Sequence, residues 1–537
     1  MKILVADAIS QKGVDALRVN PNFQVDVNTG LKEEQLLPII GDYDALIVRS
    51  QTKVNAKVIA AAKKLRVIGR AGVGVDNVDV DAATRRGIIV MNTPGGNTLS
   101  TAELACALML ALSRKVVPAN VSLVKGEWDR KRFQGTQLAG KTLGVIGMGR
   151  VGSAVAKRAI AFDMRVLAYD PYYGGPAQSG MEMVKDLSEL CKRCDYISVH
   201  VTKTVETDHM IGAAQIALMK PGVRLINAAR GGIIDPQALL EGLESGKVGG
   251  AAIDVWTDEP PVSEAEKKLI AHEKVLALPH LGASTEEAQE LVALDAAAQL
   301  VDALRGQEIR NAVNAPGFDR AMPAVMRRYA ELMQRMGRIL ASVTPGALRK
   351  VEVVYRGDVS SENTDVLTTY LAVGLLGVHV ETVNVINAPL LAQQRGVDIE
   401  VITAAQSKDF ASLVQVEIQT DGQKRTAVGT LFGRKFPRII ALDGYRMEMM
   451  PEGPLAVMFL NDQPGVIGKV GDAFGSAGVN IGHMTFGRKK STRKAVLSVN
   501  LDAPANEAVL ARLRTMDFID SVYAMVLPSL PDDGRDV

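Results

Sequence analysis

Apolar and polar positions alternate along the first 93 residues in a way typical of βα units. Four short apolar runs, at residues 3–7, 45–50, 65–72 and 88–96, each end in small or polar residues. Such runs are typical of strands buried in a parallel sheet, where loops follow the carboxyl ends of the strands. The pattern predicts a first α/β lobe. Residues 100–113, with a helical composition and little charge, are predicted to form a buried helix that leads out of it.

A second series of βα units begins near Lys141 and contains six strand candidates. Together they occupy about 140 residues, which matches a complete doubly wound domain. An Ala-rich helical pattern then runs from Thr285 to about Leu304, and residues 311–316 have the composition of a connector. Because the chain can return here to the first lobe, we expect that lobe to be discontinuous. The six candidates are TLGVIG, RVLAYDP, YISVHV, VRLINAARGG, GAAIDVW and VLALPHLG.

The pattern changes after Gly317. Residues 323–342 are predicted to be helical, segments within 348–433 alternate like strands, and we find no catalytic constellation in 318–450. Between Leu455 and Val526 the order strand, helix, strand, strand, helix, strand is that of a ferredoxin-like module. The predicted fold class is α/β, with two doubly wound parallel-sheet lobes followed by an α+β domain and a ferredoxin-like domain. The predicted domains are a substrate-binding domain at 1–97 and 287–316, a Rossmann nucleotide-binding domain at 98–286, an intervening domain at 317–450 and a C-terminal domain at 451–530.

Composition and charge narrow the class of partner. The net charge is +2 with no long charged segment, so we expect a small molecule rather than nucleic acid or an anionic membrane. Three cysteines in 537 residues argue against a disulfide framework and favour the cytoplasm. Cys191 and Cys194 form a CxxC motif without a second pair, so we expect no metal site. The start MKILVADAIS carries no visible secretory signal, and the apolar stretch at 102–112 is too short to span a bilayer.

A glycine fingerprint, GMGRVG at residues 147–152, follows an apolar strand and opens an Ala-rich helix. In this context the pattern predicts a dinucleotide site. Gly147 permits the tight turn, Gly149 lets the backbone approach the pyrophosphate, and Gly152 allows close packing of helix on strand. Asp170 ends the next strand, where its carboxylate can accept hydrogen bonds from the adenosine ribose and repel the 2′-phosphate of NADP. We therefore predict NAD as the cofactor.

Three polar residues, Arg230, Glu259 and His280, follow strands of the second series, at the sheet edge where doubly wound folds bind ligands. Oxidising an alcohol carbon requires a base for the hydroxyl proton and a cation that orients a carboxylate and polarises the oxygen. We predict His280 as general base in oxidation and general acid in reduction. Glu259 orients the imidazole and stabilises its protonated form, and Arg230 is the cation. The chain is thus predicted to be an NAD-dependent dehydrogenase of a 2-hydroxy acid.

The region 70–289 contains six ordered motifs: RAGVGVDNVD, NTPGGNTLSTAE, GKTLGVIGMGRVG, INAARGGIIDPQAL, AAIDVWTDEPP and PHLGASTEEAQ. Together they resemble the D-isomer-specific 2-hydroxyacid dehydrogenases. The resemblance implies that Arg230, Glu259 and His280 have the roles given above, and that Asp254 lies near the nicotinamide amide. The further cofactor-binding residues that it implies are Val73, Arg150, Val151, Thr202, Ala228, Ala229, Arg230, His280, Gly282 and Ala283.

The resemblance also implies that the turn Arg70-Ala71-Gly72-Val73-Gly74 and Asn97 bind substrate. Val73 stands where relatives often have threonine, so a hydroxyl contact would be missing there, whereas a backbone contact would be kept.

Arg49 and Arg70 follow strands of the first lobe and direct two cations toward the cleft between the lobes. This arrangement suits a carboxylate plus a phosphate, with a structural ion pair as the alternative for Arg49. Arg130 can add a third cation from a neighbouring subunit; a solvated surface is the alternative for its basic cluster. Together with the family resemblance, this arrangement leads us to predict 3-phosphoglycerate as the substrate, oxidised to 3-phosphohydroxypyruvate in the first step of serine synthesis.

The C-terminal module, with DQPG at 462–465 and GVNI at 478–481, resembles an ACT domain, and the preceding part resembles the extra domain of a long form within the family. This resemblance implies a homotetramer or dimer, with Asp462 and Asn480 at positions that bind L-serine in regulated relatives. An assembly module without a ligand is the alternative. Two other functions stay open: a glyoxylate or hydroxypyruvate reductase of the same family, which the long extension argues against, and an NAD-sensing, corepressor-like interaction protein.

Overall fold

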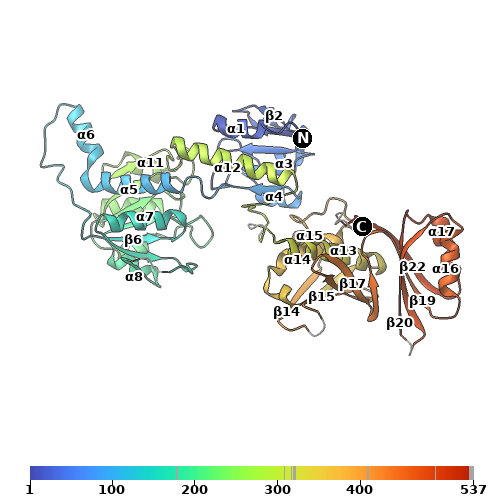
Figure 1. Ribbon diagram of the computed structural model, residues 1–537. Helices are drawn as coiled ribbons and strands as arrows, with labels where there is room; N and C mark the ends of the chain where they lie inside the picture. Colours follow the sequence, from blue (N-terminus) through green and yellow to red (C-terminus); the bar gives the residue numbers. More distant parts are fainter. Residues whose placement is uncertain are drawn as a thin grey trace.

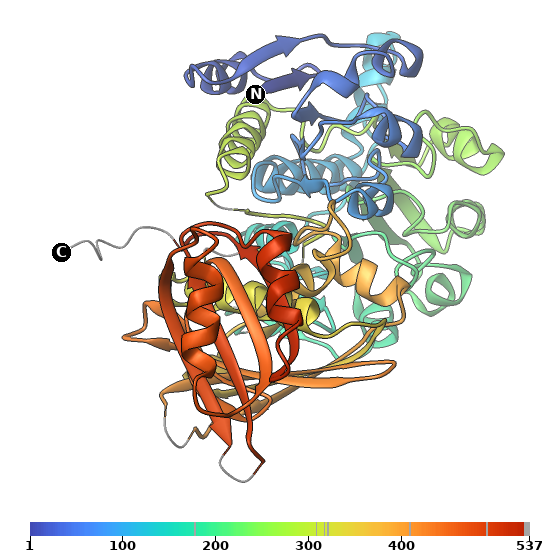
Figure 2. The same ribbon diagram turned by 90° about the vertical axis from the view of Figure 1, so that its right-hand side faces the viewer.

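The computed structural model describes residues 1–176, 179–307, 309–315, 317–318, 322–407, 410–489 and 492–530. Figure 1 shows two α/β lobes joined by helices α5 (Thr98–Arg114) and α12 (Glu286–Leu304), followed by a C-terminal half rich in long strands. Figure 2 shows the C-terminal sheet with α16 (Val466–Gly475) and α17 (Glu507–Arg514) on one face. The predicted α/β fold class is confirmed.

The first lobe contains a five-stranded parallel sheet in the order β2-β1-β3-β4-β5. Four of its strands coincide with the four predicted ones. β2 was not predicted, because its sequence QVDV is half polar and none of its residues is fully buried at the sheet edge. The elements are β1 (Lys2–Val5), α1 (Gln11–Arg18), β2 (Gln24–Val27), α2 (Glu33–Leu36), η1 (Ile40–Asp42), β3 (Ala45–Val48), α3 (Ala56–Ala61), β4 (Val67–Arg70), α4 (Val80–Arg85) and β5 (Ile89–Met91).

The second lobe contains a seven-stranded parallel sheet in the order β12-β11-β10-β9-β6-β7-β8. Six of its strands were predicted; β8 is an edge strand with the sequence MEM and no fully buried residue, so it lacks the apolar run that marks the others. The elements after α5 are α6 (Val116–Val124), β6 (Thr142–Ile146), α7 (Arg150–Ala161), β7 (Arg165–Tyr169), β8 (Met181–Met183), α8 (Leu187–Arg193), β9 (Tyr196–Val199), α9 (Ala213–Leu218), β10 (Val223–Asn227), α10 (Pro236–Glu244), β11 (Val248–Ile253), α11 (Glu264–Ala271) and β12 (Val275–Ala277).

Helix α12 carries the chain back to the first lobe, as predicted. The hydroxyl of Thr285 accepts a hydrogen bond from the N–H of Ala288 and caps the start of the helix. Ala297 and Leu300 on α12 are buried together with apolar side chains of β1, β3 and β4. The first lobe is therefore assembled from two separate parts of the chain.

The intervening part contains a six-stranded mixed sheet in the order β14-β13-β15-β16-β17-β18, with only β13 and β14 parallel. The helix predicted at 323–342 and the strand-like segments are present; the other elements had no distinct signal in the sequence. They are α13 (Ala324–Val343), β13 (Leu348–Gly357), η2 (Asp358–Ser361), α14 (Thr364–Leu376), α15 (Ala388–Gln394), β14 (Asp398–Ala404), β15 (Ser412–Thr420), β16 (Lys424–Phe432), β17 (Phe436–Leu442) and β18 (Tyr445–Met449).

The C-terminal module has the predicted βαββαβ order and a four-stranded antiparallel sheet, β20-β21-β19-β22. One face of this sheet packs on α16 and α17. The other face joins the core of the intervening part through residues such as Leu455, Val457 and Leu527. The two parts therefore share one hydrophobic core. The strands are β19 (Gly453–Asn461), β20 (Ile481–Lys489), β21 (Lys494–Leu501) and β22 (Ile519–Leu527).

Cys191 and Cys194 of the CxxC motif are both buried in the second lobe. Burial raises the pKa of the Cys191 thiol to about 11 and that of Cys194 to about 12, so both thiols stay protonated near neutral pH. Across the described residues, no group of His, Cys, Asp and Glu side chains is arranged to hold a metal ion. Within the same residues no single helix has the length and apolar composition of a membrane span, although α5 and α6 meet that test jointly across a bend of 62°.

Candidate active site

Loops after β11 and β12 bring Glu259 and His280 together. The Nδ1 atom of His280 lies 2.7 Å from Oε2 and 2.9 Å from Oε1 of Glu259. Burial opposes ionisation of Glu259, but the hydrogen bond and charge of His280, the N–H of Trp256 and the charge of Arg230 outweigh it, and the pKa of Glu259 is lowered. An ionised carboxylate only accepts hydrogen bonds, so Nδ1 carries a hydrogen, and in the neutral imidazole the lone pair is then on Nε2.

The backbone of His280 is held in the left-handed region, at φ +58°. Such a conformation costs about 1–3 kcal/mol for a non-glycine residue and needs support from its surroundings. Asp254 supplies that support. Its carbonyl accepts the His280 N–H at 2.8 Å, and its carboxylate accepts the N–H groups of Leu281 and Gly282 at 2.7 and 2.9 Å. Asp254 is fully buried, and burial raises its pKa despite these two N–H donors.

Asp254 thus positions the loop that carries His280, a role that the sequence did not reveal. Its predicted location near a nicotinamide amide stays a prediction.

Arg230 follows β10 on a turn that is fixed by Asn227, a buried residue that the sequence analysis missed. The Asn227 side chain accepts the N–H of Ala229 at 3.1 Å and donates to the carbonyl of Arg230 at 2.9 Å. The Arg230 guanidinium reaches the first lobe, where its Nε lies 3.5 Å from Asp76 Oδ2. A Cβ atom at Gly74 would overlap Nη2 of Arg230, so a larger residue at position 74 would displace this guanidinium.

Arg49, Arg70 and Arg230 form a cluster of positive charge where the two lobes meet. Burial, followed by the charges of Arg230 and Arg49, lowers the pKa of Arg70 to about 10, against the opposing charges of Asp76 and Asp7. Burial likewise lowers the pKa of Arg49. The carboxylates of Asp76 and Asp7 therefore compensate the repulsion among these guanidinium groups only in part. A site of this kind favours a multiply charged anion.

Asp7 is the acidic residue relevant to the alternative role of Arg49, a structural ion pair. Asp7 is buried beside this arginine, but its carboxylate accepts the backbone N–H of Arg49, at 2.6 Å, together with the N–H and hydroxyl of Thr52. Asp7 thus anchors the backbone of Arg49, and its charge raises the pKa of the Arg49 guanidinium against the larger effect of burial.

The turn at residues 70–74 is pinned by backbone contacts. The Val73 carbonyl accepts the side-chain amide of Asn92 at 2.6 Å, and the Gly72 carbonyl accepts the Thr93 N–H at 2.9 Å. The turn is therefore formed without a hydroxyl at position 73. Asn97 immediately precedes α5, and its side chain makes no capping hydrogen bond.

Helix α5 is tied to the loop that follows His280. The hydroxyls of Ser100 and Thr101 donate to the carbonyl of Gly282 at 2.8 and 3.1 Å. The helix that connects the lobes and the loop that carries the histidine are thereby linked.

The glycine fingerprint lies between β6 and α7, where the strand order of the second sheet reverses. Gly147 has φ +92°, and a Cβ there would lie 2.7 Å from the carbonyl oxygen of His200. A Cβ at Gly152 would overlap the carbonyl of Gly147, whereas a Cβ at Gly149 would meet nothing within 4 Å. The site is thus tight beneath the turn and open above it, which fits a pyrophosphate at the helix N-terminus.

Asp170 follows β7 and contacts the same turn. Its carboxylate accepts the N–H of Met148 at 2.8 Å and the N–H of Tyr172 at 2.9 Å. A carboxylate has about four acceptor positions, so two remain for ribose hydroxyls.

Replacing Asp170 with alanine is expected to raise the KM for NAD by about tenfold, because charge-assisted hydrogen bonds to the ribose and to the turn are lost together. The repulsion of a 2′-phosphate disappears as well, so the preference for NAD over NADP should fall. The ratio of kcat/KM for the two cofactors measures this change. An unchanged ratio would contradict the assignment of Asp170.

The other residues predicted to line the cofactor cleft lie at the expected loops. Arg150 and Val151 begin α7, Thr202 follows β9, Ala228 and Ala229 follow β10, and Gly282 and Ala283 follow His280. A Cβ at Gly95 would lie 2.7 Å from Nη1 of Arg150, so this side chain reaches the segment before α5. His200, also missed by sequence, lies beneath the turn; burial lowers its pKa to about 4, which keeps it neutral.

Three predicted ligand-binding residues lie away from this cleft. Arg130 is exposed on the arm formed by residues 115–134, which extends from the second lobe in Figure 1. Asp462 lies 3.6 Å from Nη1 of Arg488, and the Asn480 amide donates to Asp502 at 2.7 Å.

Comparison with known proteins places this site in a family. Residues 106–282 match the model of the NAD-binding domain of D-isomer specific 2-hydroxyacid dehydrogenases, and residues 325–443 match that of the D-3-phosphoglycerate dehydrogenase intervening domain. The D-3-phosphoglycerate dehydrogenase of Methanocaldococcus jannaschii is 42% identical over 98% of this chain and 100% of its own length. The chain belongs to the D-3-phosphoglycerate dehydrogenase family. The Bacillus subtilis member is 36% identical over 98% of this chain and all of its own length.

Solved structures align with part of the chain. The NAD⁺-bound 3-phosphoglycerate dehydrogenase of Entamoeba histolytica is 30% identical, with a TM-score of 0.51, over 58% of this chain and 98% of its own. A glyoxylate reductase from Paecilomyes thermophila is 31% identical, with a TM-score of 0.54, over 58% of this chain and 98% of its own. Both structures cover 58% of this chain, whereas the Methanocaldococcus jannaschii and Bacillus subtilis enzymes match 98% of it.

Proposed function

We propose that this chain oxidises 3-phospho-D-glycerate to 3-phosphohydroxypyruvate with NAD, the first step of serine synthesis. The observation that supports this proposal most strongly is the pairing of His280 with Glu259 beside the cluster Arg49, Arg70 and Arg230. A base with an available lone pair and an anion site are the two requirements of hydroxy-acid oxidation. The relatives that match nearly the whole chain are D-3-phosphoglycerate dehydrogenases, which supports the same substrate.

The open turn at Gly149 and the acceptor Asp170 would hold NAD, with Gly147 and Gly152 fixing the turn beneath it. When bound, NAD supplies the acceptor for the hydride that leaves the alcohol carbon. Nε2 of His280 accepts the hydroxyl proton. Glu259 stabilises the resulting imidazolium through Nδ1, and Arg230 binds the substrate carboxylate and polarises the oxygen as the carbonyl forms.

Arg49 and Arg70 would bind the phosphate. Replacing Arg49 with alanine is expected to lower kcat/KM for 3-phosphoglycerate by about 10- to 100-fold, because charge-assisted hydrogen bonds contribute about 1.5–3 kcal/mol. The value for D-glycerate, which carries no phosphate, should change much less. Steady-state rates with both substrates measure the difference, and an equal loss for both would contradict a phosphate-binding role.

We further propose that the chain forms a homo-oligomer through the arm at residues 115–134. Val124 and Trp128 are each 79% exposed, and soluble monomers rarely expose so many apolar side chains along one short segment. Arg130 lies two residues after Trp128. An arm that packs against a second copy can therefore bring Arg130 close to the active site of that copy. The apolar residues of the arm that are exposed are Val116, Val117, Val121, Leu123, Val124 and Trp128.

Replacing Val124 with glutamate should reduce the mass of the oligomer in solution, because a desolvated carboxylate disfavours burial in an interface. Val19→Glu is the matched control, since Val19 is 82% exposed on the first lobe. Light scattering after size exclusion measures both masses. An unchanged mass for the Val124 variant would refute this interface.

L-serine is the proposed effector, and Asp462 and Asn480 are its proposed ligands on the C-terminal module. A dimer or tetramer would then have two contacts between subunits, one through the arm at residues 115–134 and one through this module. Turnover and calorimetry with added L-serine test the proposal; no change in rate together with no heat of binding would leave assembly as the role of the module.

Three buried free cysteines support a reducing, cytoplasmic location.

A further inference from the structure

The intervening part contains a cavity of about 270 Å³ that the catalytic site does not use. It lies between the C-terminal ends of α13 and α14 on one side and the strands β13 and β15 on the other. Its volume is near the lower limit for small-molecule sites in proteins. A ligand of a few carbon atoms therefore fits it.

The interior of this cavity is aliphatic. Leu348, Leu375, Leu376, Val397 and Ile418 line it, and Thr344 and Thr420 supply hydroxyls. Both hydroxyls are already used, because Thr344 donates to the carbonyl of Leu340 and Thr420 to that of Pro345. The lining thus favours an apolar ligand body.

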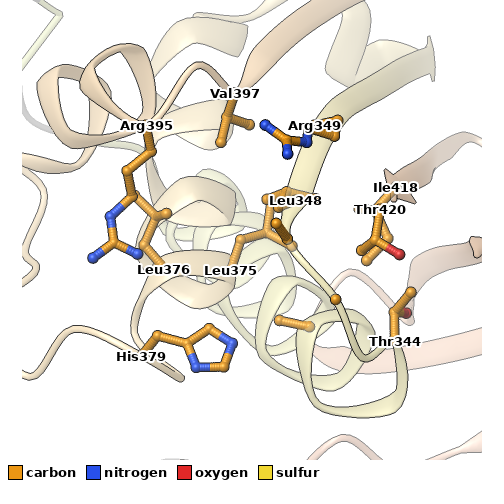
Figure 3. A pocket seen from close by; sticks show the side chains of 13 residues that line it. Thr344, Leu348, Arg349, Leu375, Leu376, His379, Arg395, Val397, Ile418 and Thr420 are labelled. Atoms are coloured by element: carbon orange, nitrogen blue, oxygen red, sulfur yellow. The ribbon is translucent and has the colours of Figure 1, made fainter. Parts of the chain in front are cut away.

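Three nitrogen-bearing side chains border the cavity. Figure 3 shows Arg395 and His379 on one side, Arg349 above, and Thr344 and Thr420 on the opposite side. Arg349 is paired with Asp421, its Nε lying 2.6 Å from Oδ1. Among the residues that the structure describes, the Arg395 guanidinium has no hydrogen-bonding or ionic partner. An available guanidinium beside an aliphatic cavity is suited to a carboxylate with a short aliphatic chain.

The segment from Leu375 to Val397 connects this cavity with the first lobe. Both of its ends line the cavity. Between them, the side-chain amide of Asn384 donates to the carbonyl of Gly87, at 2.8 Å. Ile386 is buried in a small cluster that also includes Ile89 of β5. A ligand that holds the two ends of this segment would therefore also restrain its contact with the first lobe.

We propose that this cavity binds a small aliphatic carboxylate through Arg395, and that binding stabilises the contact between the segment 375–397 and the first lobe. The site is separate from the catalytic cleft and from the proposed serine ligands Asp462 and Asn480. The bound carboxylate thus regulates the position of the first lobe relative to the intervening part.

The test uses 4,4,4-trifluorobutyrate as probe with the full-length protein, followed by fluorine NMR. The probe signal should broaden saturably with the unaltered protein. Arg395→Ala removes the cation, and Ala347→Phe fills the mouth without a change of charge; each should weaken binding by about tenfold or more. Arg356→Ala, which removes an exposed arginine of β13 outside the cavity, should leave binding unchanged.

Hydrogen exchange reports the second half of the proposal without any measurement of turnover. The probe should slow amide exchange in residues 380–395 and 84–89, and Arg395→Ala should abolish this protection. Absence of broadening, or equal affinity in both cavity variants, would overturn the site. Binding without altered exchange would overturn the coupling. Displacement of the probe by an equal concentration of inorganic phosphate would overturn the assignment to an aliphatic carboxylate.

Discussion

Replacing His280 with asparagine lowers kcat for oxidation by about 10²–10⁴-fold, the usual contribution of a positioned general base. Asparagine is the informative substitution because it tolerates the left-handed backbone found at this position, φ +58°, yet cannot accept the hydroxyl proton. The loop geometry should therefore survive while the base is lost. Single-turnover rates with saturating substrate and NAD measure the effect.

Affinity for NAD provides the control for the His280 variant. Asp254 and the backbone N–H groups that it accepts do not depend on the imidazole, so the cofactor should bind with nearly unchanged affinity. A variant that kept kcat within about threefold of the original would exclude His280 as the base, since even weak general-base catalysis exceeds this factor.

Replacing Arg230 with alanine is expected to reduce kcat/KM by about 10²–10³-fold, because truncating one partner of a desolvated charge pair costs about 2–5 kcal/mol. Arg230→Lys should recover only part of this loss, since a lysine offers a point charge where the guanidinium offers a planar pair of donors. Steady-state kinetics with 3-phosphoglycerate provide the measurement for both variants.

Asp76→Ala is the matched control for Arg230. It removes the partner that lies 3.5 Å from the guanidinium, but Asp76 is 77% exposed and exposed ion pairs contribute little. Activity should change by less than about threefold. If the Asp76 variant lost as much activity as the Arg230 variant, the role of Arg230 would be structural.

The sequence predicted most of the two lobes because their strands are buried runs that end in polar loops. Two edge strands, β2 and β8, do not carry this signal: β2 is half polar, and β8 has the sequence MEM with no fully buried residue. The intervening part was predicted less completely. Its helices and strands share one core with the C-terminal module, and such packing between distant segments leaves no local periodicity.

Candidate chemistry was visible where a residue type is unusual at a strand end, as with Arg230, Glu259 and His280. Supporting residues were not. Asn227 fixes the backbone of its own turn and Asp254 fixes that of the loop after His280, and an Asn or Asp at such a position has the same sequence signature as an ordinary turn residue. The interaction of Arg70 with Arg230 across two lobes likewise depends on how the lobes meet, which no local pattern encodes.

The central claim is that the arginine cluster and the pair His280 and Glu259 together oxidise a phosphorylated hydroxy acid. The most direct measurement is NADH formation from 3-phospho-D-glycerate and from D-glycerate by the unaltered protein. We predict a kcat/KM for the phosphorylated acid at least about tenfold higher, as expected for charge-assisted phosphate binding. Equal efficiency with both acids, or a preference for D-glycerate, would contradict this account.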